Sequence, residues 1–160
     1  MADEGLQLLA PGLDRDMLLL SWWGQLIDDG ELSDIFAEVA STPTGFLGLF
    51  NNPTTAFFAR QDAQGAAVMI WFEQFMGAAA LGLWARKDFR GRKYWDDLIA
   101  AVRRVFEHVQ LVMFMTKHPH VVAASRDFGF TFIGTMPYLY HGQPGHIAYL
   151  TREGFKERHG

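Results

Sequence analysis

The sequence predicts a mixed α/β (α+β) fold, in which a mixed central sheet with an antiparallel meander is flanked by helices. Two observations carry this prediction. Apolar residues recur at helical spacing before and after a central region, and that region consists of short β-rich runs with tight connections. Of 160 residues, 49% are hydrophobic and 14% are aromatic, enough for a well-filled core. No repeat or low-complexity linker interrupts the chain, so residues 1–160 are predicted to form a single domain.

The first part of the chain is predicted to form a short strand and two helices. Residues 6–9 favour a strand, and the following helix is expected to start with Asp14 as N-cap and to stop near Gly30. A second helix is expected over 32–40. The Ser-Thr-Pro-Thr-Gly segment 41–45 is expected to end it.

The meander is predicted over the middle of the chain. Strands are expected over 46–50, 56–60, 66–75 and 78–85, where β-forming residues lie between turn-forming segments. Gly77 separates the last two strands. Connections this short favour antiparallel neighbours.

A helical period returns in the second half. One apolar helix face is formed by Leu98, Ile99, Val102, Val105, Phe106 and Val109. A buried strand is expected over 110–116, and a short helix is expected from Pro119 to Ser125. The last strands are expected over 131–134 and 148–151, with a long loop rich in proline and glycine between them.

Composition excludes several classes of function. The chain has no cysteine, which excludes disulfides, thiolate zinc sites and a cysteine nucleophile. A net charge of -4 argues against general nucleic-acid binding. The longest apolar stretch, 75–85, is too short to span a bilayer, so no membrane partner is expected. We expect a cytoplasmic protein.

Two segments carry a resemblance to a known family. The first is WARKDFRGRKYW, residues 84–95, and the second is AASRDFGFTFIG, residues 123–134. The first resembles the strand, R/Q-x-x-G-x-G/A loop and helix start of the GNAT-type N-acyltransferase superfamily. The second resembles that family's Gly-Phe signature between a helix and a strand. The resemblance implies a GNAT-like fold and an acetyl-CoA site, and extends to divergent acetyltransferase-like proteins of bacteriophages.

The first segment has the chemistry of a phosphate loop. A helix N-terminus offers unpaired N–H groups and partial positive charge, and basic side chains add charge-assisted contacts. Five cations lie within eight residues, namely Arg86, Lys87, Arg90, Arg92 and Lys93. The resemblance assigns acetyl-CoA to Trp84, Ala85, Arg90, Gly91, Arg92, Lys93 and Tyr94. The alternative is a solvated turn between a strand and a helix.

The chain departs from the family pattern at three positions. Lys93 occupies the first motif glycine and Trp95 occupies the final Gly/Ala position, where a tryptophan either blocks the backbone approach or faces the core. Many family members place a tyrosine acid four residues before the Gly-Phe glycine, where this chain has Ser125. A hydroxyl donates a hydrogen bond but is a poorer acid.

Candidate catalytic groups are few. Glu73 is the acid nearest to the predicted strand 78–85 and is a candidate base, although an exposed strand position explains it equally. Ser125 is a candidate acid. His118 and His120 are candidate acids or bases because of the chemistry of the imidazole ring, but they also fit a helix-capping loop beside Pro119. Two histidines without a third ligand do not make a metal site, so no metal is expected.

Three functions follow. The first is acyl-CoA-dependent transfer of an acetyl group to the amine of a small molecule or protein. The second is a catalytically inactive GNAT-fold structural or assembly protein, such as a virion protein of a bacteriophage, that self-associates or binds protein partners through Trp22 or Trp23 and the 138–141 loop. The third is a coenzyme A or nucleotide sensor that binds without turnover.

Overall fold

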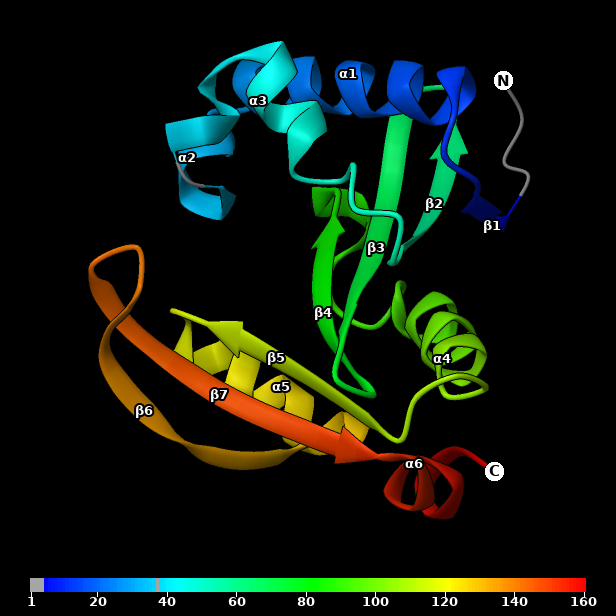
Figure 1. Cartoon of the computed structure of the whole chain (residues 1–160), viewed down its shortest axis with the longest axis vertical. Coiled ribbons are helices and arrows are strands. Elements are labelled where there is room, and N and C mark those ends of the chain that lie inside the picture. The colour runs from blue at the N-terminus through cyan, green and yellow to red at the C-terminus, as the bar shows by residue number, and fades with distance from the viewer. Residues whose placement is uncertain (1–4, 37) are drawn as a thin grey trace. The chain divides into compact units, whose positions relative to one another are not determined.

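The computed structural model describes residues 5–36 and 38–160 (Figure 1). The described residues form seven strands: β1 (Leu6–Leu9), β2 (Thr55–Asp62), β3 (Gly65–Phe75), β4 (Ala78–Ala85), β5 (Leu111–Thr116), β6 (Thr131–Tyr140) and β7 (Gln143–Thr151). The α-helices are α1 (Leu13–Asp28), α2 (Leu32–Ile35), α3 (Pro43–Gly48), α4 (Trp95–Val105), α5 (Pro119–Phe128) and α6 (Arg152–His159). Two 3₁₀ turns are η1 (Glu38–Ser41) and η2 (Lys87–Phe89).

Hydrogen bonding gives the strand order β1-β2-β3-β4-β5-β7-β6. β4 and β5 pair in parallel, with Ala78 opposite Leu111, whereas β1–β2, β2–β3, β5–β7 and β6–β7 pair antiparallel. The predicted fold class is therefore confirmed: the chain has a mixed sheet, mostly antiparallel, with flanking helices.

The chain divides into two compact units. The first unit comprises Met1–Glu73 and Leu83–Asp97, and the second comprises Gln74–Gly82 and Leu98–Gly160. Strands β3 and β4 and helix α4 contribute residues to both. No helix in the described ranges is long and apolar enough to cross a bilayer.

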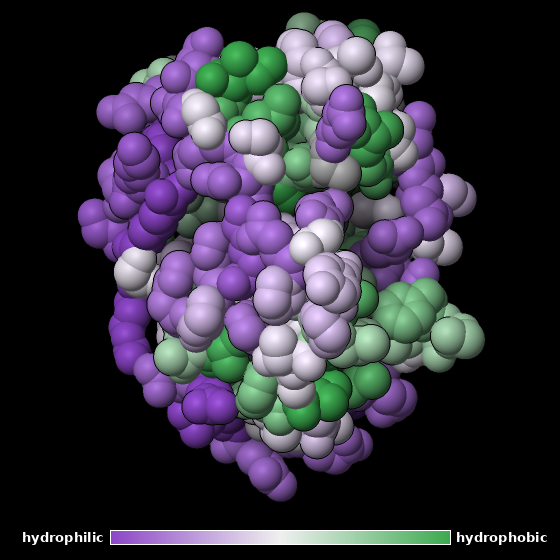
Figure 2. Space-filling model, turned by 90° about the vertical axis from the view of Figure 1, so that its left-hand side faces the viewer, coloured by the Kyte–Doolittle hydropathy of each residue, from purple (hydrophilic) through white to green (hydrophobic). Residues whose placement is uncertain are grey.

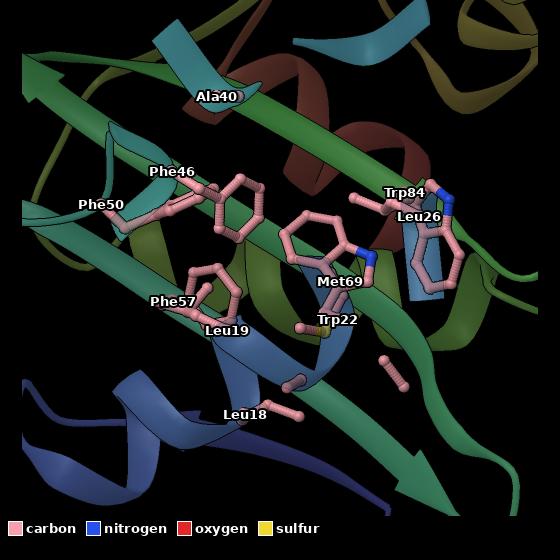
Figure 3. Packing of buried hydrophobic residues seen from close by; sticks show 12 residues of the cluster. Leu18, Leu19, Trp22, Leu26, Ala40, Phe46, Phe50, Phe57, Met69 and Trp84 are labelled. Carbon is pink, nitrogen blue, oxygen red and sulfur yellow. The ribbon is translucent and has the colours of Figure 1, made fainter. Parts of the chain in front are cut away.

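Aromatic side chains fill the core of the first unit (Figure 3). Trp22 is fully buried at its centre, and its ring centroid lies 5.5 Å from that of Phe46 and 5.6 Å from that of Trp84. Trp23 is half-buried, and its indole N–H donates to the carbonyl of Ala40 at 2.8 Å. The adjacent tryptophans therefore serve different contacts, because neighbours on a helix point about 100° apart.

The second unit has its own apolar core. Its fully or nearly buried members are Ala78, Ala79, Leu98, Ala101, Val102, Val105, Phe106, Val109, Val112, Val122, Phe128, Phe130, Ala148, Leu150 and Phe155. Five of the six residues of the predicted helix face are buried and Ile99 is half-buried, but α4 ends at Val105, so Phe106 and Val109 lie in the turn after the helix. Hydrophobic patches are interrupted by hydrophilic side chains on the face drawn in Figure 2.

The segment before β2 differs from the prediction. The expected strand over 46–50 is wrong, because α3 covers Pro43–Gly48. Thr42 caps this helix by accepting a hydrogen bond from the Gly45 N–H at 3.1 Å, and Pro43 occupies its first turn. The Thr-Pro pair expected to break a helix therefore starts one. The helix expected over 32–40 is replaced by α2 and η1, with residue 37 outside the described residues.

The last hairpin is longer than predicted. In place of a loop over 135–147, β6 and β7 extend to a two-residue turn at His141 and Gly142, both with positive φ. Pro137 is tolerated because β6 is an edge strand, and positive φ at Tyr138 marks the register shift between Met136 and Tyr140. Helix α6 was not predicted.

Candidate functional site

The candidate site is the segment between β4 and α4, here called the 86–94 loop. It contains η2, a turn over residues 90–94, and Gly91 with φ of 78°. Only glycine adopts this left-handed conformation without strain, so Gly91 fixes the path of the turn into α4. The whole loop belongs to the first unit.

Arg86 anchors the start of the loop. Its guanidinium lies 2.6 Å from Asp62 Oδ2 and 2.6 Å from Asp88 Oδ1, and its backbone N–H donates to the carbonyl of Ala67 at 2.8 Å. These hydrogen bonds lower the pKa of Asp62 to about 2, lower the pKa of Asp88 and raise the pKa of Arg86. The guanidinium of Arg86 is thus already paired with two carboxylates.

Arg90 anchors the middle of the loop. Its Nε donates to the carbonyl of Ala85 at 2.9 Å, and its Nη2 pairs with the carboxylate of Glu31. Glu31 lies between α1 and α2, so this pair joins the loop to the helical layer of the first unit. Arg90 matches the first motif position, yet its charge is already matched by an acid.

The start of α4 is fixed by a further pair. Asp97 is 6% exposed and accepts two hydrogen bonds from Arg60 on β2, at 2.7 and 2.8 Å. Just before α4, the Arg92 guanidinium lies 4.6 Å from the centroid of the Trp95 ring. Trp95 is half-buried, so the residue at the final motif position presents a ring face to a basic side chain.

Backbone donors and two lysines complete the loop. In the part of the chain that the structure describes, no acceptor contacts the N–H groups of Gly91, Lys93 or Tyr94. The ammonium groups of Lys87 and Lys93 are exposed, and no described residue pairs with them. Donors and cations before a helix of eleven residues form a setting suited to an anionic phosphate.

Two of the predicted acetyl-CoA residues, Trp84 and Ala85, lie at the end of β4. Trp84 is 4% exposed and its side chain packs in the aromatic core, so any ligand contact of Trp84 is limited to its main chain. The carbonyl of Ala85 accepts from Arg90. Two of the seven predicted cofactor residues thus end β4 and the other five lie in the 86–94 loop, where their surroundings differ.

The three candidate catalytic residues lie apart from this loop in the sequence and have local partners. Glu73 is exposed near the end of β3, where its Oε1 accepts from Asn52 at 3.4 Å. Ser125 is half-buried on α5, and its hydroxyl donates to the carbonyl of Val122 at 2.7 Å. His118 is exposed before α5, with its ring centroid 5.2 Å from that of His120.

Sequence reasoning missed the acids that hold the loop. Asp62 is 24 residues from Arg86 and Glu31 is 59 residues from Arg90, so no local pattern connects them. It also missed a cross-strand pair in which the Thr135 hydroxyl lies 2.7 Å from Nδ1 of His146. Across residues 5–36 and 38–160, no three acidic or histidine side chains gather closely enough to hold a metal ion.

Solved structures share this architecture. A spermidine N-acetyltransferase SpeG chimera from Vibrio cholerae and hSSAT matches with a TM-score of 0.74 and 15% identity, over 96% of this chain and 99% of that one. An aminoglycoside N(6')acetyltransferase from Legionella pneumophila matches with a TM-score of 0.73 and 17% identity, over 96% and 95%. The chain has the GNAT fold.

A third similar structure was solved with a bound ligand. RimL, a ribosomal L7/L12 alpha-N-protein acetyltransferase in complex with coenzyme A, matches with a TM-score of 0.71 and 12% identity, over 94% of this chain and 96% of that one. No family model and no curated protein matches the chain by sequence. At these identities the likeness establishes the fold, and function rests on the site.

Proposed function

We propose that this chain binds an acyl-coenzyme A at the 86–94 loop and transfers the acyl group to an amine. The observation that carries the proposal is the set of backbone donors at Gly91, Lys93 and Tyr94, beside the unpaired ammonium of Lys93. The similar structures support it, because they are acetyltransferases of spermidine, aminoglycosides and a ribosomal protein. We also propose that residues 1–160 act as one domain.

Each part of the loop has a distinct role in this proposal. The backbone donors and Lys93 hold a diphosphate group, whereas Arg86 and Arg90 hold the loop in shape through their acids. Bound acyl-coenzyme A would supply a thioester that is open to attack by an amine. The chain's own contribution is mainly to position the two reactants, because its candidate acid, Ser125, already donates to a carbonyl.

Calorimetric titration with acetyl-CoA tests the binding step. We expect Lys93→Glu to weaken binding by about tenfold or more, because it removes a charge-assisted contact and adds repulsion. Lys156→Glu, an exposed lysine on α6, makes the same charge change and is the control. Equal loss in both variants, or no binding by the parent chain at millimolar ligand, would contradict the proposed site.

The second candidate is a catalytically inactive protein of this fold, used in assembly, for example in a bacteriophage virion. It is favoured by Ser125 at the tyrosine position and by the acids that already occupy Arg86 and Arg90. Release of free thiol from acetyl-CoA in the presence of a panel of polyamines and aminoglycosides separates the candidates. Binding without thiol release would support a sensor, and absence of both would support the assembly protein.

A further inference from the structure

Helix α1 has two apolar faces. Its inner face packs in the aromatic core of the first unit through Leu18, Leu19, Trp22 and Leu26. The opposite face carries four exposed residues: Leu13 is 73% exposed, Met17 61%, Leu20 37% and Ile27 45%. A surface helix normally places polar residues there, because exposed apolar area is unfavourable in water. The outer face is therefore an unusual feature of this helix.

The spacing of these residues is that of a helix–helix seam. With Gly24 they stand at positions 13, 17, 20, 24 and 27, alternating steps of four and three. This is the a/d pattern of a heptad. At about 100° per residue, all five fall within roughly 40° of one line along the helix. We call this set the α1 outer stripe; it runs for about 21 Å.

Acidic residues border the stripe on both sides. Asp14 and Asp28 flank one side and Asp16 the other, at the positions that set partner choice in paired helices. The only basic residue of α1, Arg15, is buried on the inner side, where it donates to the carbonyl of Phe50. A second copy of α1 in antiparallel orientation would bring Asp14 against Asp28, and in neither orientation would it supply a basic side chain to pair with these aspartates.

We propose that the α1 outer stripe docks an amphipathic helix of a partner protein, about four turns long, with an apolar seam flanked by lysine or arginine. The apolar seam covers Leu13, Met17, Leu20 and Ile27, and the basic flanks meet the aspartates. Gly24 leaves room at the seam for a larger side chain of the partner. This surface is separate from the 86–94 loop in sequence, and the proposal does not depend on the proposed function.

The test uses a synthetic 15-residue amphipathic peptide with leucine at its seam and lysine on its flanks, labelled for fluorescence anisotropy. A matched peptide carries glutamate in place of lysine. The full chain is expected to bind the lysine peptide at micromolar concentration, and the glutamate peptide at least tenfold more weakly. Asp14→Lys/Asp28→Lys is expected to reverse this preference.

Two double variants distinguish binding at the α1 outer stripe from nonspecific binding to exposed apolar residues. Leu13→Ser/Met17→Ser is expected to lose at least tenfold in affinity, whereas Ile133→Ser/Met136→Ser, at exposed apolar residues of β6, is expected to bind like the parent. Thermal unfolding checks that each variant is folded. Equal binding by both variants, or no binding by the parent, overturns the proposal. Dimerisation in analytical ultracentrifugation that Leu13→Ser/Met17→Ser abolishes also overturns it, because the occupant is then a second copy.

Discussion

In the proposed function, the ligand would compete with Glu31 for the guanidinium of Arg90. Its guanidinium pairs with Glu31, yet it stands at the first position of the loop motif. Glu31→Gln is expected to raise the affinity for acetyl-CoA by about threefold to tenfold, because it removes a negative charge near the ligand, while the glutamine oxygen still accepts the Arg90 hydrogen bond that holds the loop in shape. Calorimetry measures the change. Asp29→Asn removes a nearby exposed charge, and an equal gain there would assign the effect to the general field rather than to Arg90.

Asp62 makes stability depend on pH in a defined direction. Its pKa falls from 3.8 to about 2 in the folded chain, chiefly through its hydrogen bonds with Arg86. A carboxyl group with a lowered pKa stabilises the fold above its ordinary pKa, and this contribution is lost as the pH falls from about 4 to 2. The side chain is 23% exposed, so screening leaves about 1 kcal/mol.

Urea unfolding of Asp62→Asn at pH 6, 4 and 3 measures this contribution. The variant is expected to be less stable than the parent by about 1 kcal/mol at pH 6, with a difference that shrinks toward pH 3. Glu157→Gln, an exposed acid on α6, controls for net charge. A constant difference at all three values would mean that Asp62 acts through packing alone.

The sequence shows which residues of the loop are basic, but not which of them pair with acids. Five cations within eight residues predicted an anion site in the 86–94 loop. Their separation into anchors and available groups depends on Asp62 and Glu31, which tertiary structure brings from distant positions. A single sequence carries no local signal for such pairs.

At the scale of elements, helix α3 provides a sharp contrast between two glycines. A Cβ at Gly45 would lie 1.9 Å from the carbonyl oxygen of Val39, whereas a Cβ at Gly48 meets nothing within 4 Å. Gly45→Ala is therefore expected to lower the free energy of unfolding by about 2–4 kcal/mol through forced backbone movement. Gly48→Ala is expected to be neutral or to stabilise by up to about 1 kcal/mol.

Thermal and urea unfolding of the two variants check this contrast. Both changes add the same methyl group to the same helix, so helix propensity cannot account for a difference. Equal effects on the free energy of unfolding would show that Val39 of η1 moves away from Gly45 of α3 without loss of stability.

The sequence predicted strands better than it predicted short helices. β2, β3 and β4 follow clear runs of β-forming residues between turn signals, and all three were predicted. The 46–50 segment resembled a strand because Phe46 and Phe50 are aromatic, yet both are buried beside Trp22 from α3 and the turn after it. Helix α6 was missed because its residues are mostly polar, with Phe155 as its buried anchor.

At the scale of the whole chain, the element order was sufficient to predict the fold class. The prediction of a mixed sheet did not say which strands pair in parallel; the structure shows that they are β4 and β5, which α4 connects along the chain. The α1 outer stripe was not predicted, because a helix with apolar residues on both faces gives the same sequence signal as a broad buried face.

The aromatic core has a spectroscopic consequence. All five tryptophans belong to the first unit: Trp22, Trp23, Trp71, Trp84 and Trp95. Their emission therefore reports on the first unit alone, whereas far-ultraviolet circular dichroism reports on the backbone of both. If residues 1–160 unfold as one cooperative domain, the two signals share one midpoint. A later midpoint by dichroism would mean that the second unit keeps its structure after the light emitted by the first has already shifted to the red.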